Sequence, residues 1–270
     1  MSTEQDMLDA LIQHQVYTHR ASTKVVNELN KGFTSATNTF ANRLRELLDE
    51  LTDSEREALT AGKYTTDTLK ELREAFSEYY EYTVTAMPEA FAASAATLAA
   101  YEVGYIANLY GEALEASGES IAKNALNKPV VGGQLANDVW RTIAEKTREK
   151  ALYAVREGIQ QGLTTAQIVS QIRGTRTKVG DKYVYVGGIV DQSKNQIDAA
   201  VRTLRSHVSN EAMSHTFEAL GFDYVKFYNV LDGRTSKTCA HYSNKVYKAS
   251  EPHPTPPMHY NCRSILIGVD

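Results

Sequence analysis

Apolar residues recur at steps of three and four along the first 172 residues, which is the spacing of one face of a helix. The pattern opens with Leu8, Leu11, Ile12 and Val16. A second helix is expected from about 35 to 51, with Phe40, Leu44, Leu47 and Leu48 facing inward. The pattern therefore predicts a chain that begins with long amphipathic helices.

Capping and breaking residues divide the rest of this region. Thr52 and Thr66 offer N-caps for a short helix and for a helix from about 68 to 86. Because the residue before a proline resists helical geometry, that helix should end near Pro88, which suits the first turn of a helix reaching about 114 or beyond. A break at 129–133 precedes a helix from about 135 to 161. Residues 1–162 are therefore predicted to form a helical bundle.

The periodicity changes to two after a short helix at about 166–173. Alternation in 175–190, with Gly180-Asp181 as the turn, predicts a β-hairpin. A helix from about 192 to 220 follows, and then come short strand candidates at 224–228, 245–247 and 264–267. The predicted fold class is α+β and mostly α: the helical region 1–162 precedes a small α+β domain, 163–270, with a short antiparallel sheet.

The amino-acid composition indicates which classes of protein are compatible with this sequence. The chain has 270 residues, of which 42% are hydrophobic and 23% charged, as in soluble globular proteins. A net charge of −4 argues against a protein that coats nucleic acid, although local basic patches stay open. The acidic start, 1–6, lacks the features of a signal peptide. Charges interrupt the alanine-rich stretch 86–109, so no membrane span or membrane partner is expected.

The predicted hairpin contains the most basic short window of the chain, formed by Arg173, Arg176, Lys178 and Lys182. These side chains could contact the phosphates of DNA. Alternatively, these residues form a solvent-exposed edge of the hairpin, where lysine side chains prevent pairing with a further strand, and this interpretation is equally open.

The residues best suited to metal binding or catalysis lie in the tail, residues 232–263, which contains both cysteines of the chain. Cys239, His241, His259 and Cys262 offer two thiolates and two imidazoles, the ligands that suit a structural zinc ion. Two cysteines without an export signal read first as reduced thiols or metal ligands. A Cys239–Cys262 disulfide or close thiol pair is a second interpretation.

A third interpretation assigns these residues purely structural roles. Both cysteines would be small buried hydrophobes, and His259 and Asn261 would hydrogen-bond the loop backbone. Asp232 and Arg234 would then form a structural pair that fixes the turn before Cys239, and Arg263 would satisfy either Asp232 or loop carbonyls.

Catalysis by this tail is not expected. A thiol nucleophile or a metal nuclease is conceivable. A nuclease metal site needs carboxylates and an open coordination position, whereas Asp232 and Glu251 are the nearby acids and a Cys/His set of four is closed. The protein is therefore predicted not to be an enzyme.

Several short motifs of the second half occur together in one protein family. They are Gly162-Leu163-Thr164, Val201-Arg202-Thr203, Asp232-Gly233-Arg234-Thr235, Cys239, Lys245-Val246-Tyr247, Pro257 and His259-Tyr260-Asn261-Cys262-Arg263-Ser264. On these residues the chain, from about 163 onward, resembles the C-terminal domain of the phage Mu F-like minor head proteins, the phage head morphogenesis family. Asn244 replaces a glycine usual in relatives, and asparagine also tolerates left-handed backbone geometry.

The resemblance implies a component of the virion of a tailed bacteriophage. It implies binding to the portal protein or the major capsid protein, a place in the capsid interior or at the portal vertex, and several copies per particle. Head assembly in the host cytoplasm and DNA packaging or ejection are the expected processes, with phage DNA a further partner. The alternatives are a zinc-dependent DNA-processing factor or nuclease, and a toxin-trafficking module that lacks its toxin domain.

Overall fold

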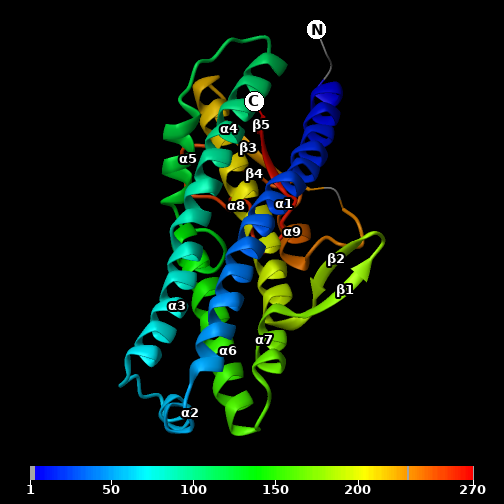
Figure 1. Cartoon of the computed structure of the whole chain (residues 1–270). Helices are drawn as coiled ribbons and strands as arrows, with labels where there is room; N and C mark the ends of the chain where they lie inside the picture. Colours follow the sequence, from blue (N-terminus) through cyan, green and yellow to red (C-terminus); the bar gives the residue numbers. More distant parts are fainter. Residues whose placement is uncertain (1–3, 230, 270) are drawn as a thin grey trace. The chain divides into compact units, whose positions relative to one another are not determined.

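The computed structural model describes residues 4–229 and 231–269 and is mostly helical, with small antiparallel sheets (Figure 1). This confirms the predicted fold class. The helices are α1 (Glu4–Glu50), α2 (Asp53–Thr60), α3 (Asp67–Val84), α4 (Ala86–Leu109), α5 (Gly118–Leu126), the 3-10 turn η1 (Val131–Gly133), α6 (Ala136–Gln160), α7 (Thr165–Arg173), α8 (Gly188–Ala219) and α9 (Lys237–Tyr242). The strands are β1 (Thr175–Val179), β2 (Lys182–Val186), β3 (Tyr224–Tyr228), β4 (Val246–Lys248) and β5 (Ile265–Val269).

The chain forms two compact units, each assembled from separated stretches. Unit 1 comprises 1–27, 89–139 and 199–270, and unit 2 comprises 28–88 and 140–198. The boundary predicted between 162 and 163 lies inside unit 2. The division of the chain at that point into a helical region and a C-terminal domain stays a prediction.

Helix α1 is a single helix of 47 residues, where the apolar pattern predicted two. Its buried stripe continues from Leu11 through His14, Thr18 and Ser22, at the same steps of three and four. Because these buried residues are polar, the stripe has no hydrophobic signal there, and the continuity of the helix was missed.

The region after α4 also differs from the prediction. Helix α4 ends at Leu109, since Gly111 adopts a positive φ of 77° that stops it. Helix α5 was not predicted. It begins directly after its N-cap residue Ser117, whose side chain accepts a hydrogen bond from the Ser120 amide. The short helix α9 was likewise not predicted.

Unit 2 contains a core of aromatic residues and the predicted hairpin. Phe40 of α1 stacks on Tyr79 of α3, with ring centroids 4.8 Å apart. Strands β1 and β2 pair antiparallel from Thr175 opposite Val186 to Val179 opposite Lys182, which confirms the two-residue turn. Val184 is 40% exposed and Tyr183 59%, so little of this hairpin is buried.

Unit 1 contains a three-stranded antiparallel sheet in the order β4-β3-β5. One face of the sheet packs Ile265 and Ile267 against Ile106 of α4 and Met213 of α8. On the other face, Phe227 lies in a second apolar cluster with both cysteines. The Cys/His tail therefore covers the side of the sheet that does not face the helices.

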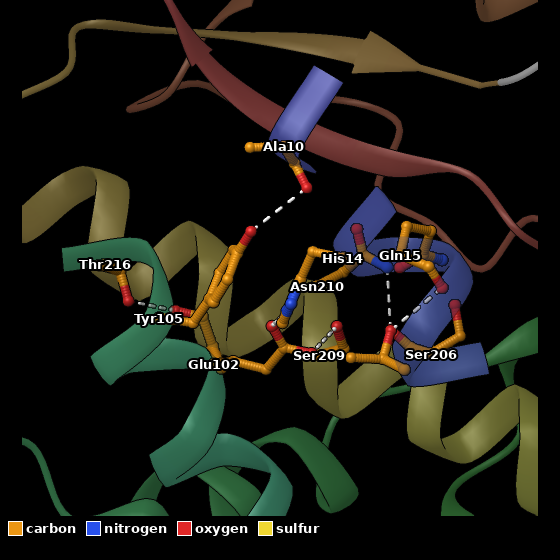
Figure 2. A network of polar contacts seen from close by, with 11 residues as sticks. Ala10, His14, Gln15, Glu102, Tyr105, Ser206, Ser209, Asn210 and Thr216 are labelled. Atoms are coloured by element: carbon orange, nitrogen blue, oxygen red, sulfur yellow. Dashed lines mark hydrogen bonds and ion pairs between the residues drawn. The ribbon is translucent and has the colours of Figure 1, made fainter. Parts of the chain in front are cut away.

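Helix α8 carries many of the polar contacts of unit 1, although its residues 203–210 are all buried. Ser209 donates to the Glu102 carboxylate of α4 at 2.8 Å, and the same carboxylate lies 2.6 Å from His14 Nε2 of α1 (Figure 2). The Arg205 guanidinium donates to Ser22 and Ser94. Since each partner comes from a different helix, these contacts tie α1, α4 and α8 together.

Among the described residues, one stretch, Asp67–Leu109, is long and apolar enough to cross a membrane by length and composition alone. Core helices of soluble proteins pass the same test, and 44% of the apolar window is buried inside the structure. The predicted lack of a membrane partner stays a prediction.

Candidate metal centre and adjoining pocket

Three of the four predicted ligands meet in unit 1. The Cys239 Sγ lies 3.6 Å from Cys262 Sγ and 3.3 Å from His259 Nε2, and the three ligand atoms all lie within 4.8 Å of one another. Ligands at ordinary zinc–sulfur and zinc–nitrogen distances, arranged as a tetrahedron, lie about 3.5–3.8 Å apart. Two of the three separations are near these values, and the three side chains lie close enough together to hold a metal ion.

His241 does not belong to this group. Its ring is exposed, and its Nε2 lies 3.0 Å from the Lys245 ammonium. Cys239 and His241 are two positions apart on α9, and residues at that spacing point to different sides of a helix. The Cys-x-His spacing looked like a ligand pair only because the sequence did not reveal this helix.

The backbone around each ligand is held by specific contacts. Ser236 caps α9 and accepts a hydrogen bond from the Cys239 amide at 3.1 Å. On either side of Cys262, the Asn261 amide donates to Thr203 of α8, and Asn210 of the same helix accepts from the Leu266 amide. Buried polar residues of α8 thus fix the segment that presents Cys262.

The orientation of His259 favours ligation through Nε2. Its Nδ1 lies 2.9 Å from the Tyr260 carbonyl, to which a protonated Nδ1 donates, leaving the Nε2 lone pair towards the sulfurs. Such a contact to the other ring nitrogen is the usual way to fix the tautomer of a metal-binding histidine.

The two cysteines are free thiols that share a hydrogen bond. That bond from Cys239 lowers the pKa of Cys262 to about 5, with help from hydrogen bonds of Ser264 and Met258. The same contact and burial raise the pKa of Cys239. The pair therefore favours one thiolate and one thiol, and thiolate is the form that binds metal.

The Asp-x-Arg-Thr motif forms a turn that is locked by Arg263. The two nitrogens of Arg263 donate to the two oxygens of Asp232 at 3.0 and 2.7 Å. Asp232 also accepts from the backbone amide of Arg234, and the Asp232 amide donates to Thr235. The hydrogen bonds from Arg263 hold the pKa of the Asp232 carboxyl well below its ordinary range. Of the two partners expected for Arg263, Asp232 is the one it contacts here, and Arg234 contacts Asp232 through its backbone amide.

Other motif residues determine the backbone conformation of the loops. Asn261 and Asn244 adopt positive φ angles of 59° and 64°, a backbone geometry that asparagine tolerates better than most other residues. Pro257 is buried and follows a cis peptide bond. Asn261 donates its backbone amide to the Thr203 hydroxyl, and His259 contacts the loop backbone at the Tyr260 carbonyl, as the third interpretation expected.

A pocket of about 450 Å³ adjoins the candidate metal centre inside unit 1. Cys239 and His259 line it, and so do the paired Asp232 and Arg263. The fourth coordination position of a metal held by three protein ligands could therefore be reached from this pocket. Sequence reasoning missed it, because its wall also includes Gln15 and Arg20 of α1, more than 200 residues away in the chain.

The four basic residues of the hairpin region belong to unit 2. Arg176 stacks on the Tyr183 ring at 4.4 Å, and Arg173 stacks on Tyr185 at 4.0 Å. Lys178 and Lys182 are exposed.

Comparison with known proteins bears on the second half of the chain. A search of curated proteins and a search of solved structures found no match. A family model described as "Phage Mu protein F like protein" matches residues 149–267, somewhat less than half of the chain. The match covers all the motif residues of the candidate site and associates this part of the chain with phage head morphogenesis. Residues 149–267 are thus similar to phage Mu protein F.

Proposed function

We propose that this protein is a minor head protein of a tailed bacteriophage that acts by binding other head components. The family match over residues 149–267 carries the proposal. The assembly of the Asp232, Cys239 and His259–Arg263 motifs around one small sheet supports it, because a family motif is informative when its residues meet in space.

The partners in this proposal are the portal protein or the major capsid protein, at the portal vertex or the inner capsid wall. The protein would join the head in several copies in the host cytoplasm and aid DNA packaging or ejection. Quantitative mass spectrometry of purified virions and empty heads, with the portal protein as internal standard, tests this. We expect the chain in both particles at a fixed ratio to portal. Its absence from both would overturn the proposal.

The proposed activity is not enzymatic. The two acids that a metal nuclease could use near the tail are both engaged, Asp232 with Arg263 and Glu251 with Lys248 at 3.1 Å. The competing function is a zinc-dependent nuclease, which the pocket beside three ligands would suit. Incubation of the protein with DNA and divalent metals separates the two: specific cleavage that His259→Ala abolishes would establish the nuclease. A gene neighbourhood without portal or terminase would favour the toxin-trafficking alternative.

We also propose that Cys239, His259 and Cys262 hold a structural zinc ion that clasps the tail to the sheet. The interatomic distances and the Nδ1 contact of His259 support this. Elemental analysis of wild-type protein should find about one equivalent of zinc. Cys262→Ser should lose it, whereas His241→Ala, which changes a histidine of the same tail outside the group, should keep it. Negligible zinc in the wild type would favour the thiol-pair interpretation.

A contact of the hairpin with phage DNA completes the proposal. The register of β1 and β2 puts Arg176 opposite Tyr185 and Lys178 opposite Tyr183. Opposed residues share one face of a hairpin, so basic and aromatic side chains gather on the same side. Such a surface suits phosphate contacts with stacking on bases.

A further inference from the structure

The pocket beside the candidate metal centre is positively charged, although the whole chain has a net charge of −4. Arg20, Arg234 and Arg263 line it together with one acidic residue, Asp232. Arg263 is paired with this carboxylate, whereas Arg20 and Arg234 are exposed. The two exposed arginines give the pocket an excess of positive charge, which favours a ligand with a negative charge.

Asn229, at the end of β3, lines the same pocket with an unused side-chain amide. The residue is only 7% exposed, and neither Nδ2 nor Oδ1 has a hydrogen-bond partner among the described residues. The Oε1 atom of Gln15, another lining residue, also has none there. A buried amide without partners costs about 1–3 kcal/mol. Such a cost is offset when a ligand supplies one acceptor and one donor side by side.

A peptide group supplies that pair of atoms. Its carbonyl oxygen can accept from Nδ2 of Asn229, and an adjacent N–H can donate to Oδ1. The pocket also exposes aliphatic groups of Ile12 and Val16 from α1, which suit an aliphatic side chain better than a stacked base. Its volume of about 450 Å³ is within the range of pockets that enclose a small ligand or a few residues of a peptide.

We propose that this pocket binds an extended segment of another protein that carries an acidic side chain beside an aliphatic one. In this complex, Asn229 pairs with the main chain of the segment, and Arg20 and Arg234 pair with its carboxylate. The aliphatic side chain lies against Ile12 and Val16. The inference rests on the proposed function only in taking a protein as the partner, and it does not require that the metal centre be filled.

The test follows the Asn229 side-chain amide in NMR spectra of the full chain labelled with ¹⁵N-asparagine. The probe is the capped tripeptide acetyl-Leu-Asp-Val-amide, with acetyl-Leu-Asn-Val-amide as its neutral match and deoxycytidine monophosphate as the nucleotide alternative. We expect the acidic peptide to shift the Asn229 signals in a saturable way at millimolar concentration. The neutral peptide should bind about tenfold more weakly, because it loses charge-assisted hydrogen bonds.

Variants assign the effect to the pocket. Arg234→Gln, an exposed change that leaves the fold intact, should weaken the acidic peptide to the level of the neutral one. Arg176→Gln, a matched change on the hairpin, should not. Asn229→Leu should abolish binding and raise the melting temperature of the free protein, since it removes an unsatisfied buried amide.

Three outcomes would overturn the proposal: no shift of the Asn229 signals at about 20 mM acidic peptide, equal binding of both peptides, or binding of the nucleotide in preference to them. These results would leave the presence of the protein in virions untouched, so a failure here is distinguishable from a failure of the proposed function.

Discussion

The buried pair of His14 and Glu102 offers the sharpest stability test of unit 1. The two side chains are 1% and 0% exposed, and the Glu102 carboxylate also accepts from Ser209. It attracts the Arg205 guanidinium as well, which opposes the lowering of the Arg205 pKa by burial. Tyr105 stacks on the His14 ring at 3.7 Å and donates its hydroxyl to the Ala10 carbonyl (Figure 2).

Replacing Glu102 by leucine should lower the free energy of unfolding by about 3–5 kcal/mol, the cost of removing one partner from a buried pair. Ser209 would lose its acceptor, and the nearby Arg205 its counter-charge. A loss of this size is a large fraction of the about 5–15 kcal/mol that stabilises a typical domain.

The measurement is urea unfolding followed by far-UV circular dichroism. Glu78→Gln is the matched control, because it breaks the exposed pair with Arg43 and should cost less than about 1 kcal/mol. The double variant His14→Leu with Glu102→Leu should be more stable than the sum of the single changes predicts, by about 0.5–3 kcal/mol. If Glu102→Leu lost less than about 1 kcal/mol, or if the single effects simply added, the pair would not organise these helices.

Four further predictions follow from other contacts. Gly118→Ala should lower the free energy of unfolding by about 1–3 kcal/mol, because the new Cβ would lie 2.4 Å from the Ala96 carbonyl oxygen. Gly104→Ala on α4, where a Cβ meets nothing within 4 Å, should raise it by about 0.5–1 kcal/mol. Equal effects of the two variants would refute this. Burial lowers the pKa of His207, so protonation of this side chain is less favourable in the native state than in the unfolded state. The free energy of unfolding should therefore fall as the pH drops below the unfolded pKa of about 6.5. His207→Gln, which can still donate to the Ala125 carbonyl, should remove that part of the pH dependence of the urea midpoint. A chelator should lower the melting temperature of wild type and of His241→Ala but not of Cys262→Ser, and a uniform response would argue against the three-residue metal site. Replacing Arg176, Lys178 and Lys182 by glutamine should reduce the salt dependence of DNA binding by about 0.9 in log–log slope for each lost phosphate contact, and an unchanged slope would remove the hairpin from the DNA surface.

Local signals in the sequence were sufficient for most elements. Thr52 and Thr66 cap helices α2 and α3 as predicted, and their side chains accept hydrogen bonds from the amides of Glu55 and Leu69. The hairpin turn at Gly180-Asp181 and the strands β3 to β5 also lie where alternation predicted them. These signals succeed because a cap or a tight turn is decided by a few neighbouring residues.

The continuity of α1 was missed because its buried residues His14, Thr18 and Ser22 are polar, and an apolar pattern counts them as surface. Helix α8 was predicted, but the burial of its polar residues Arg205 and Asn210 was not. Their burial is possible only because partners on other helices and on β5 satisfy them. No local signal in the sequence reports that pairing.

By itself, the sequence determined the helical class, the hairpin, the small sheet and the motifs by which the chain from about 163 onward resembles the phage Mu F-like proteins, a resemblance that the family match over residues 149–267 supports. Only the tertiary structure decided which of the four predicted Cys/His ligands come together, because the direction of His241 depends on the short helix α9. Only the structure placed α1 beside the tail and so formed the pocket with Asn229. Motifs follow from the order of residues, whereas ligand sets and pockets depend on distances between residues that are far apart in the chain.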